Sequence, residues 1–478
     1  MTILTITWLT LFFILGLGIY LLPRLDWFLA FGVTLVSVAY ATFVFRQPEP
    51  INLELLDSFG VTLIADRQSA FFILTNAFVC TAVLLYCWRS NKTPFFYTQL
   101  TILQGSVNSV FICADFLSVY VALEVISIAA FLLITYSRSD RTIWVGLRYL
   151  FVSNVAMLFY LVGVALVYKA NNSFAFTGLT NAPTEAIALI FLGLLAKGGI
   201  FISGLWLPLT HSESETPVSA LLSGVVVKTG IFPLVRCALM LEDLDPIVRI
   251  FGVGTALLGV SYAVFEQDIK RMLALSTISQ LGFILAAPEV GGFYALTHGL
   301  VKSTLFLIGG NLPSRNLKEL QQNPMPNSLW IALTVASFSI SGFPLLSGFG
   351  AKVLTLKNLL PWQVIAMNIA ALGTATMYGK LIFLPHQRLE EGKQKPISFW
   401  LAITLLIGGL IGVSAFYYEA YTLANIIKPL ATIALGWAAY WLVFRQVTVR
   451  LPRMLEEFDH LIGMMSLMLL LLFWMVLP

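Results

Sequence analysis

Apolar segments long enough to cross a lipid bilayer follow one another through almost the whole chain. A helix needs about 20 apolar residues to span the hydrocarbon core. On this measure we place fourteen segments at 3–22, 26–45, 69–89, 96–113, 115–136, 144–168, 184–206, 217–240, 247–265, 272–288, 291–311, 328–358, 361–386 and 398–417. Two more apolar blocks lie at 424–444 and 461–477. The sequence therefore predicts an all-α polytopic membrane protein with 14 to 16 transmembrane helices.

The composition agrees with this prediction and excludes other classes. Hydrophobic residues make up 58% of the 478 residues and charged residues 11%, whereas soluble domains carry about 25% charged residues. The net charge of +4 is small for this length, so nothing suggests nucleic acid as a partner. The four cysteines form no CxxC pair, and we expect buried thiols. The sequence contains no catalytic, metal or cofactor motif, so we expect a chain that is not itself an enzyme and holds no cofactor.

Two of the segments carry residues that interrupt a helix. The seventh contains AKGGIFISG, with Gly198 and Gly199 directly after Lys197, and the twelfth contains SGFPLLSGFGAK, with Pro344 and Gly348. Proline cannot donate a backbone hydrogen bond, and glycine loosens a helix. Irregular backbone at membrane depth is tolerated only where it is buried in protein or lines a wet cavity. Broken helices seven and twelve therefore point to a transporter.

Polar positions in the first half of the chain recur in the second half. The matches are Lys197 with Lys352 at an offset of 155, Arg148 with Lys302 at 154, Lys228 with Lys380 at 152, and Glu124 near the uncharged Gln280 at 155–156. Each offset covers five segments, so the second copy enters the membrane from the opposite side, as in an inverted repeat. We therefore divide the chain into N-terminal helices (1–92), a first five-helix repeat (93–241), a second, inverted repeat (242–388) and C-terminal helices (389–478).

The recurring charges suggest a path for protons. An ionised side chain near the bilayer centre costs roughly 2.5–3.5 kcal/mol, so such groups must face one another or a hydrated path. A row of lysines with His298, bridged by water, can conduct protons. His298 and Lys302 are four residues apart, which places both on one helix face. Arg148 stays protonated, which suits tuning rather than carrying.

Each residue also has a purely structural interpretation. Glu124 could form a static ion pair with Arg148 or Lys197, and His298 could be a hydrogen-bonded core residue. Lys228, Lys352 and Lys380 could extend to a membrane interface. Aspartates at segment edges, namely Asp66, Asp115 and Asp268, are expected helix caps. The loop HSESET (211–216) is either an acidic vestibule or a solvated helix cap.

Positive charge is unevenly distributed between the loops. Numbered from the N-terminus, odd loops hold 12 Lys and Arg residues and even loops hold 5. The odd-loop residues are Arg24, Arg89, Lys92, Arg138, Arg141, Lys270, Arg271, Arg315, Lys318, Arg388, Lys393 and Lys395, and the even-loop residues are Arg46, Arg67, Lys169, Arg249 and Lys357. Basic loops stay in the cytoplasm. We therefore expect the odd loops inside and the N-terminus outside.

Several sequence stretches resemble a known family. They are ADFLSVYVALEVIS (114–127), WLPLTHSESETPVSALLSGVVVKTGIFPLVR (206–236), EQDIKRMLALSTISQLGFIL (266–285), HGLVKSTLFLIGG (298–310) and GFPLLSGFGAK (342–352). They are similar to the antiporter-like proton-translocating subunits of Mrp-type cation/proton antiporters, respiratory complex I with its photosynthetic relatives, and membrane-bound hydrogenases. The resemblance covers roughly residues 60–390.

The resemblance implies a fold and a set of functional residues. The fold has fourteen core helices with inverted five-helix repeats at helices 4–8 and 9–13. The implied proton path consists of Glu124, Lys197, Lys228, His298, Lys302 and Lys352. Two departures stand out: Tyr294 occupies a position where the family often has a second histidine, and Arg148 replaces the usual lysine of helix 6.

The subtype follows from the same residues. Lys352 and the His298/Lys302 spacing look most like the D-type subunit of the Mrp-type Na⁺/H⁺ antiporters, and less like the related complex I (NADH dehydrogenase) chains 2, 4 and 5. This implies a cation/proton antiporter subunit that works with other membrane subunits, H⁺ and Na⁺, in a bacterial-type cytoplasmic or thylakoid membrane. Two alternatives stay open: a proton-pumping subunit of a redox complex resembling complex I or a membrane hydrogenase, and a structural or assembly subunit without transport of its own. Residues 418–478 lie outside the resemblance.

Overall fold

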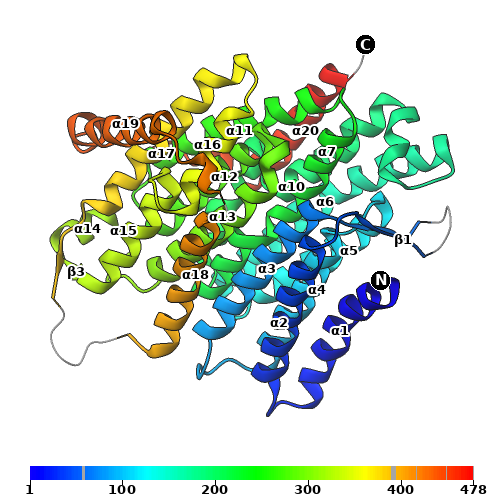
Figure 1. Cartoon of the computed structure of the whole chain (residues 1–478), viewed down its shortest axis with the longest axis horizontal. Coiled ribbons are helices and arrows are strands. Elements are labelled where there is room, and N and C mark those ends of the chain that lie inside the picture. The colour runs from blue at the N-terminus through cyan, green and yellow to red at the C-terminus, as the bar shows by residue number, and fades with distance from the viewer. Residues whose placement is uncertain (56–59, 389–394, 416, 448, 450, 477–478) are drawn as a thin grey trace.

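The chain is almost entirely helical. The computed structural model describes residues 1–55, 60–388, 395–415, 417–447, 449 and 451–476 (Figure 1). Lys393 of the charge count and residues 416 and 477 of the predicted spans lie outside the described residues.

The described α-helices, in chain order, are α1 (Thr2–Leu21), α2 (Asp26–Phe45), α3 (Arg67–Tyr86), α4 (Pro94–Val110), α5 (Phe116–Ile134), α6 (Asp140–Asn171), α7 (Thr184–Gly198), α8 (Leu207–Glu213), α9 (Thr216–Leu221), α10 (Lys228–Met240), α11 (Asp245–Phe265), α12 (Ile269–Ala286), α13 (Gly291–Gly309), α14 (Leu317–Gln322), α15 (Asn327–Ser341), α16 (Ser347–Lys357), α17 (Val364–Ile382), α18 (Ile397–Ala415), α19 (Leu423–Ala439) and α20 (Phe458–Val476). Short 3₁₀ or π segments are η2 (Phe176–Asn181), η3 (Phe201–Trp206), η4 (Leu222–Val226), η5 (Pro288–Val290), η6 (Pro361–Gln363), η7 (Tyr418–Ala420), η8 (Tyr440–Phe444) and η9 (Met454–Glu456). Strands β1 (Ile51–Glu54) and β2 (Thr62–Ala65) pair antiparallel, and β3 (Met325–Pro326) and β4 (His386–Gln387) pair parallel.

The prediction of an all-α polytopic protein is confirmed. Among the described residues, 12 helical segments are long and apolar enough to cross a membrane. Four other predicted spans correspond to α4, α13, α15 with α16, and α17, which are helical but shorter or more polar than that measure requires. A helix suits this setting because it satisfies its backbone polar groups internally, where lipid offers no partners.

Aspartate caps start three of the helices, as the sequence predicts. A side-chain oxygen of each accepts a backbone N–H in the first turn: Asp66 from Ser69 at 2.8 Å, Asp115 from Ser118 at 2.6 Å and Asp268 from Arg271 at 3.0 Å. These contacts satisfy N–H groups that have no partner inside the helix.

Two helices are interrupted close to the predicted lysines. α7 ends at Gly198, Gly199 takes a left-handed φ of +69°, and the chain continues through η3 into α8. The second interruption separates α15 from α16 and contains Gly342 with φ of +89°. Glycine adopts such φ values without the steric penalty of a Cβ. The first interruption lies after Lys197, whereas the second lies before Lys352, so the two halves are not identical copies. The inverted repeat itself stays a prediction.

Loops of like number meet at the same end of the bundle. Between odd loops, Lys92 pairs with Glu215, Arg141 lies 3.8 Å from Glu213, and β3 pairs with β4. Between even loops, isolated bridges join Leu63 to Cys113 and Asp115 to Ala175. We call these ends the odd-loop end and the even-loop end. Successive predicted spans therefore run in alternating directions between the two ends. The loops that carry more Lys and Arg residues lie together at the odd-loop end.

The C-terminal helices, for which the sequence offers no account, pack on widely separated parts of the bundle. α19 packs against α17, and α20 packs against α7 and η3. Figure 1 shows α19 and α20 on opposite sides of the bundle. Before α20, Glu456 accepts two hydrogen bonds from Arg271 at 2.6 and 2.8 Å. This contact fastens the chain between α19 and α20 to the odd-loop end.

A close helix contact near the predicted site depends on glycine. A Cβ on Gly230 of α10 would lie 2.3 Å from the backbone nitrogen of Gly198. We predict that Gly230→Ala forces α7 and α10 apart and lowers the free energy of unfolding by about 1–3 kcal/mol. Thermal unfolding in detergent measures this. Gly412→Ala on α18 is the control, because no heavy atom lies within 4 Å of its added Cβ. Equal melting temperatures for the two variants would contradict the prediction.

Candidate functional site

The predicted lysines lie inside the bundle. Lys228 and Lys302 have no exposed surface, and Lys197 and Lys352 expose 3% and 4% of theirs. His298 is equally buried. This burial excludes the interpretation in which Lys228 and Lys352 extend to a membrane interface. All five side chains must therefore find their partners within the protein.

In the first half of the chain, two serines hold Lys197. Its Nζ donates to the hydroxyl of Ser127 on α5 and, at 2.8 Å, to that of Ser153 on α6. The two hydroxyl oxygens lie 3.1 Å apart. The ring of Tyr149 lies under the amine, with its centroid 5.8 Å from Nζ. The amine is thus held by neutral oxygens.

Glu124 lies one helical turn from Ser127 on α5. Its side chain is half-buried, and its Oε1 has no hydrogen-bond partner. Among the described residues, no ion pair joins Glu124 to Lys197 or to Arg148. The static ion pair is therefore not what the structure shows. Ser127, one turn from Glu124 on the same helix, accepts from the Lys197 amine instead.

Lys228 follows a π turn. The π segment η4 precedes α10, and the Lys228 Nζ donates back to the carbonyl oxygens of Gly224 at 2.5 Å and Ser223 at 3.3 Å. A wider turn leaves carbonyls without their regular helical donors, and π turns often occur at functional sites. α13 lies directly against this point: a Cβ on Gly299 would be 3.0 Å from the Gly224 oxygen and 3.7 Å from the Lys228 Nζ.

Lys302, three residues after Gly299 on α13, points toward α12 and α17. Its Nζ donates to the Leu273 carbonyl at 2.9 Å and to the Tyr378 hydroxyl at 3.0 Å. The Tyr378 hydroxyl also lies 3.0 Å from the Ser276 hydroxyl. Lys302 and Lys228 therefore have different partners, although Lys302 belongs to α13 and the Lys228 amine lies against it.

His298 has space beside it for water. Among the described residues, no protein atom forms a hydrogen bond with either ring nitrogen. A cavity of about 10 Å³ is lined by His298 and by Gly348 and Ala351 of α16. This is about the space that one water molecule needs. The next residue of α16, Lys352, donates to the Ser341 carbonyl at the end of α15, at 3.4 Å.

Tyr294 and Gln280 line the same cavity and bind each other. The Tyr294 hydroxyl donates to Gln280 Oε1 at 2.7 Å, and Gln280 Nε2 donates to Thr374 at 3.3 Å. Tyr294 stands where the family often has a second histidine, and Gln280 is the second-half counterpart of Glu124. The two residues thus bind each other.

Two of the predicted tuning residues lie apart from the lysines. Arg148 is buried beside Trp144, 5.8 Å from its ring, and two of its nitrogens have no partner. Lys380 donates to the carbonyls of Val264 and, at 3.3 Å, Glu266, where α11 ends. A cation there interacts favourably with the helix dipole. Lys380 is therefore a residue of the odd-loop end, but at 6% exposure it is buried like Lys352 and does not extend to a membrane interface.

Sequence reasoning missed the neutral partners of these lysines. These partners are uncharged, and the spans contain many hydroxyl residues, so the sequence does not distinguish them. They are Ser127, Ser153 and Tyr378. Their one signal is helical spacing, since Ser127 follows Glu124 by three residues. His211, assigned to a polar loop, is instead fully buried in α8, with its Nδ1 at 3.0 Å from the Leu207 carbonyl.

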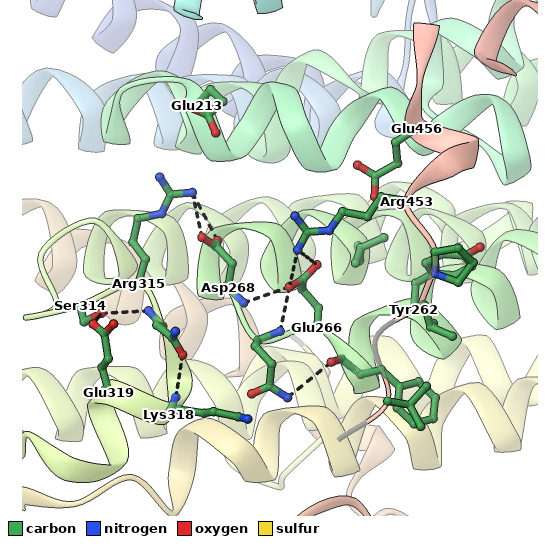
Figure 2. A pocket seen from close by; sticks show the side chains of 17 residues that line it. Glu213, Tyr262, Glu266, Asp268, Ser314, Arg315, Lys318, Glu319, Arg453 and Glu456 are labelled. Atoms are coloured by element: carbon green, nitrogen blue, oxygen red, sulfur yellow. Dashed lines mark hydrogen bonds and ion pairs between the residues drawn. The ribbon is translucent and has the colours of Figure 1, made fainter. Parts of the chain in front are cut away.

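Charged cavities open at both ends of the bundle. At the odd-loop end, a cavity of about 770 Å³ is lined by ion-paired residues, with Arg315 3.0 Å from Asp268 and Arg453 3.3 Å from Glu266 (Figure 2). At the even-loop end, a cavity of about 810 Å³ is lined by Asp66 and other polar residues. Both ends of the bundle therefore carry a polar cavity at the surface. Groups of His, Cys, Asp or Glu able to hold a metal ion are absent from the described part of the chain.

Glu266 forms ion pairs with two arginines, Arg271 and Arg453, at the odd-loop cavity. Burial alone would raise the pKa of its carboxyl, but the backbone N–H of Asp268 and the guanidinium of Arg271 outweigh burial and lower the pKa below its ordinary value. Glu266 therefore stays ionised and connects Arg271 with Arg453.

A model of the family described as the NADH:quinone oxidoreductase/Mrp antiporter transmembrane family matches residues 113–377. The match covers more than half of the chain, and the chain belongs to this family of integral, multi-pass membrane proteins.

Individual relatives come from both branches of the family. The D-type subunit of the Na⁺/H⁺ antiporter of Alkalihalophilus pseudofirmus is 26% identical over 452 residues, covering 84% of this chain and 91% of the relative. The N-type subunit of the NADH-quinone oxidoreductase of Desulforudis audaxviator is 28% identical over 363 residues, covering 68% of this chain and 72% of the relative. The chain also shares its fold with a chain of the Mrp complex from Dietzia sp., with a TM-score of 0.76, 23% identity, and coverage of 93% of this chain and 56% of that chain.

The serine pair provides a test of how Lys197 is held. We predict that the double variant Ser127→Ala/Ser153→Ala lowers the free energy of unfolding by about 1–3 kcal/mol, because a buried amine loses its acceptors. Adding Lys197→Met should restore most of the loss, since no unpaired polar group remains. Ser109→Ala on α4, whose hydroxyl bonds only the backbone of its own helix, serves as the control. A double variant that melts like the wild type would contradict the assignment.

The lowered pKa of Glu266 predicts a dependence on pH. A carboxyl whose folded pKa is depressed stabilises the protein above its ordinary pKa, about 4.5, and loses that contribution as pH falls through the lower, folded value. We expect Glu266→Gln to reduce the acid-induced drop in melting temperature below pH 4.5 and to lower the melting temperature at pH 7. The exposed Glu242→Gln should change neither. An unaltered acid response in Glu266→Gln would show that the pairing is unimportant.

Proposed function

We propose that this chain is the proton-translocating subunit of a multisubunit monovalent cation/proton antiporter, similar to the D-type subunit of Mrp antiporters. The observation that carries the proposal is the row of buried basic side chains, Lys197, Lys228, His298, Lys302 and Lys352, on helices that touch one another. Neutral oxygens hold the lysines, and no carboxylate of the described residues is ion-paired to them. A lysine without a fixed counter-ion can change its protonation state without breaking an ion pair.

The helix contacts support a continuous path. α7 and α10 meet at Gly198 and Gly230, which brings the segments of Lys197 and Lys228 together. η4 meets α13 at Gly224 and Gly299, beside the Lys228 amine. From α13, the small cavity beside His298 reaches α16 and thus Lys352. Each step crosses one helix contact, and water can bridge the remaining gaps.

The residues take different roles in this proposal. Lys197 is the switch of the first half and Glu124 its modulator, because a change of charge near Glu124 alters the proton affinity of Lys197 through space. Lys228 is the central relay, and His298, Lys302 and Lys352 form the path of the second half. Arg148, Lys380 and Gln280 tune the path, and the breaks at Gly198, Gly199, Pro344 and Gly348 leave backbone groups free near it.

The surroundings of Glu124 support work within a larger complex. A half-exposed carboxyl midway along α5 is costly in lipid, so a neighbouring subunit would cover it. The partners are other membrane subunits, together with H⁺ and Na⁺, as the names of the antiporter relatives suggest.

The topology is part of the same proposal. Residues 1–92 are N-terminal helices, 93–241 and 242–388 the two inverted repeats, and 389–478 the C-terminal helices. Because odd loops carry more positive charge, the odd-loop end faces the cytoplasm and the N-terminus lies outside. The membrane is a bacterial-type cytoplasmic membrane or a thylakoid membrane.

A second candidate function is a proton-pumping subunit of a complex I-like redox assembly. Its support is the relatives named as NADH- and NAD(P)H-quinone oxidoreductase subunits, which match this chain at 28% identity. Purification of the native complex separates the candidates. Small antiporter subunits in the complex favour the first, and quinone- and iron–sulfur-binding subunits favour the second.

Transport by the purified complex in proteoliposomes tests the proposal directly. We expect Lys197→Ala or Glu124→Ala to slow cation-driven proton movement at least about tenfold while the complex still assembles. Lys169→Ala is the matched control, because this lysine is exposed at the end of α6. Antiport at the wild-type rate in both variants would favour a structural or assembly subunit instead.

A further inference from the structure

Lys302 has an environment that differs from those of the other lysines. Lys197 is held by two serines, and Lys228 and Lys352 by backbone carbonyls. Lys302 alone among these four donates to a phenol, the hydroxyl of Tyr378, together with the Leu273 carbonyl. A phenol oxygen can accept from the amine and donate its own hydrogen elsewhere, which a carbonyl cannot do.

The Tyr378 hydroxyl has two partners. The side chain is fully buried in α17, and its oxygen lies 3.0 Å from both Lys302 Nζ and Ser276 Oγ. Ser276 is one turn from Leu273 on α12, so the two groups that position the amine share one helix face. Two residues along α17, Lys380 is bound to the end of α11. The backbone that carries Tyr378 is therefore anchored as well.

The Lys302 and Lys228 amines have different hydrogen-bond partners. Those of Lys228 belong to η4, and those of Lys302 belong to α12 and α17. Lys302 is a residue of α13, and Gly299, three residues earlier in the same helix, allows the Lys228 amine to come close. Two amines beside the same stretch of helix repel each other when both are protonated. The bonds of the Lys302 amine to Leu273 and Tyr378 fix where it lies and so set the distance that a proton must cover from Lys228.

Packing alone does not explain a tyrosine at this position. Phenylalanine would fill nearly the same volume, whereas a buried hydroxyl without a partner costs roughly 1–3 kcal/mol. Tyr160 shows the simpler case, because its equally buried hydroxyl donates to the Phe116 carbonyl at 2.8 Å and touches no lysine of the row.

We propose that Tyr378 is a positioning residue of the transport path, whose hydroxyl holds the Lys302 amine against α12 and so fixes the length of the step between Lys228 and Lys302. The inference rests on the proposed function, since it assigns a role to Tyr378 only if protons pass through Lys302. It adds a residue of α17 to a path otherwise made of α7, α10, α13 and α16.

The test compares Tyr378→Phe with Tyr160→Phe in the purified complex reconstituted in vesicles, with assembly and melting temperature measured for each. We expect Tyr378→Phe to slow proton movement about tenfold and to enlarge the ratio of rates in H₂O and D₂O, because the proton step becomes slower than the others. Tyr160→Phe should retain both values. A slower rate with an unchanged isotope ratio, or an equal loss in Tyr160→Phe, would indicate a structural role and overturn the inference.

Lys302→Ala separates this inference from the proposed function. If Lys302→Ala stops transport while Tyr378→Phe transports at the wild-type rate and isotope ratio, the inference is wrong and the proposed function stands. If Lys302→Ala itself transports at the wild-type rate, the proposed path through Lys302 fails, and the role of Tyr378 fails with it. Should Tyr378→Phe not assemble, Ser276→Ala decides the question, because it removes the second partner of the hydroxyl and leaves the ring. A slower rate with a larger isotope ratio then supports the inference, and wild-type values overturn it.

Discussion

The need to satisfy buried amines with neutral oxygens governs the architecture of this protein. Lys197, Lys228, Lys302 and Lys352 lie inside an apolar bundle, where an amine without acceptors is costly. Regular helices offer few acceptors, because their carbonyls are already bonded along the helix. The chain provides oxygens at irregular points, such as the π turn before Lys228 and the end of α15 near Lys352. At these two lysines, helix irregularity and buried charge therefore occur together for a physical reason, whereas Lys197 and Lys302 are held by groups on regular helices.

The sequence predicts the outline of this fold well. Apolar length locates the helices, aspartates mark three helix starts, and glycine with proline marks the two interruptions. These signals succeed because each depends on local backbone hydrogen bonding, and lipid offers no partner for a backbone group left unpaired. The alternation of ends follows from the number of crossings, and the pairing of loops, for example Lys92 with Glu215, agrees with it.

The site is less accessible to such reasoning. Charged residues are rare in apolar spans, so the lysines stand out, but the oxygens that hold them are spread over distant segments. Ser127, Ser153 and Tyr378 lie 70, 44 and 76 residues from the lysines they contact. Only tertiary packing brings them together. The same limit applies to a Glu124 ion pair. The charges that would form it are visible in the sequence, whereas the two serines that hold Lys197 instead are not.

The C-terminal segment has a mechanical consequence. α19 packs on α17 and α20 packs on α7. In the segment between α19 and α20, Glu456 accepts two hydrogen bonds from Arg271. A polypeptide attached at both flanks and at the middle resists any hinge-like opening of the molecule along its long direction. An opening between these parts would first have to break the Glu456–Arg271 pair or lift α19 or α20 from its neighbour.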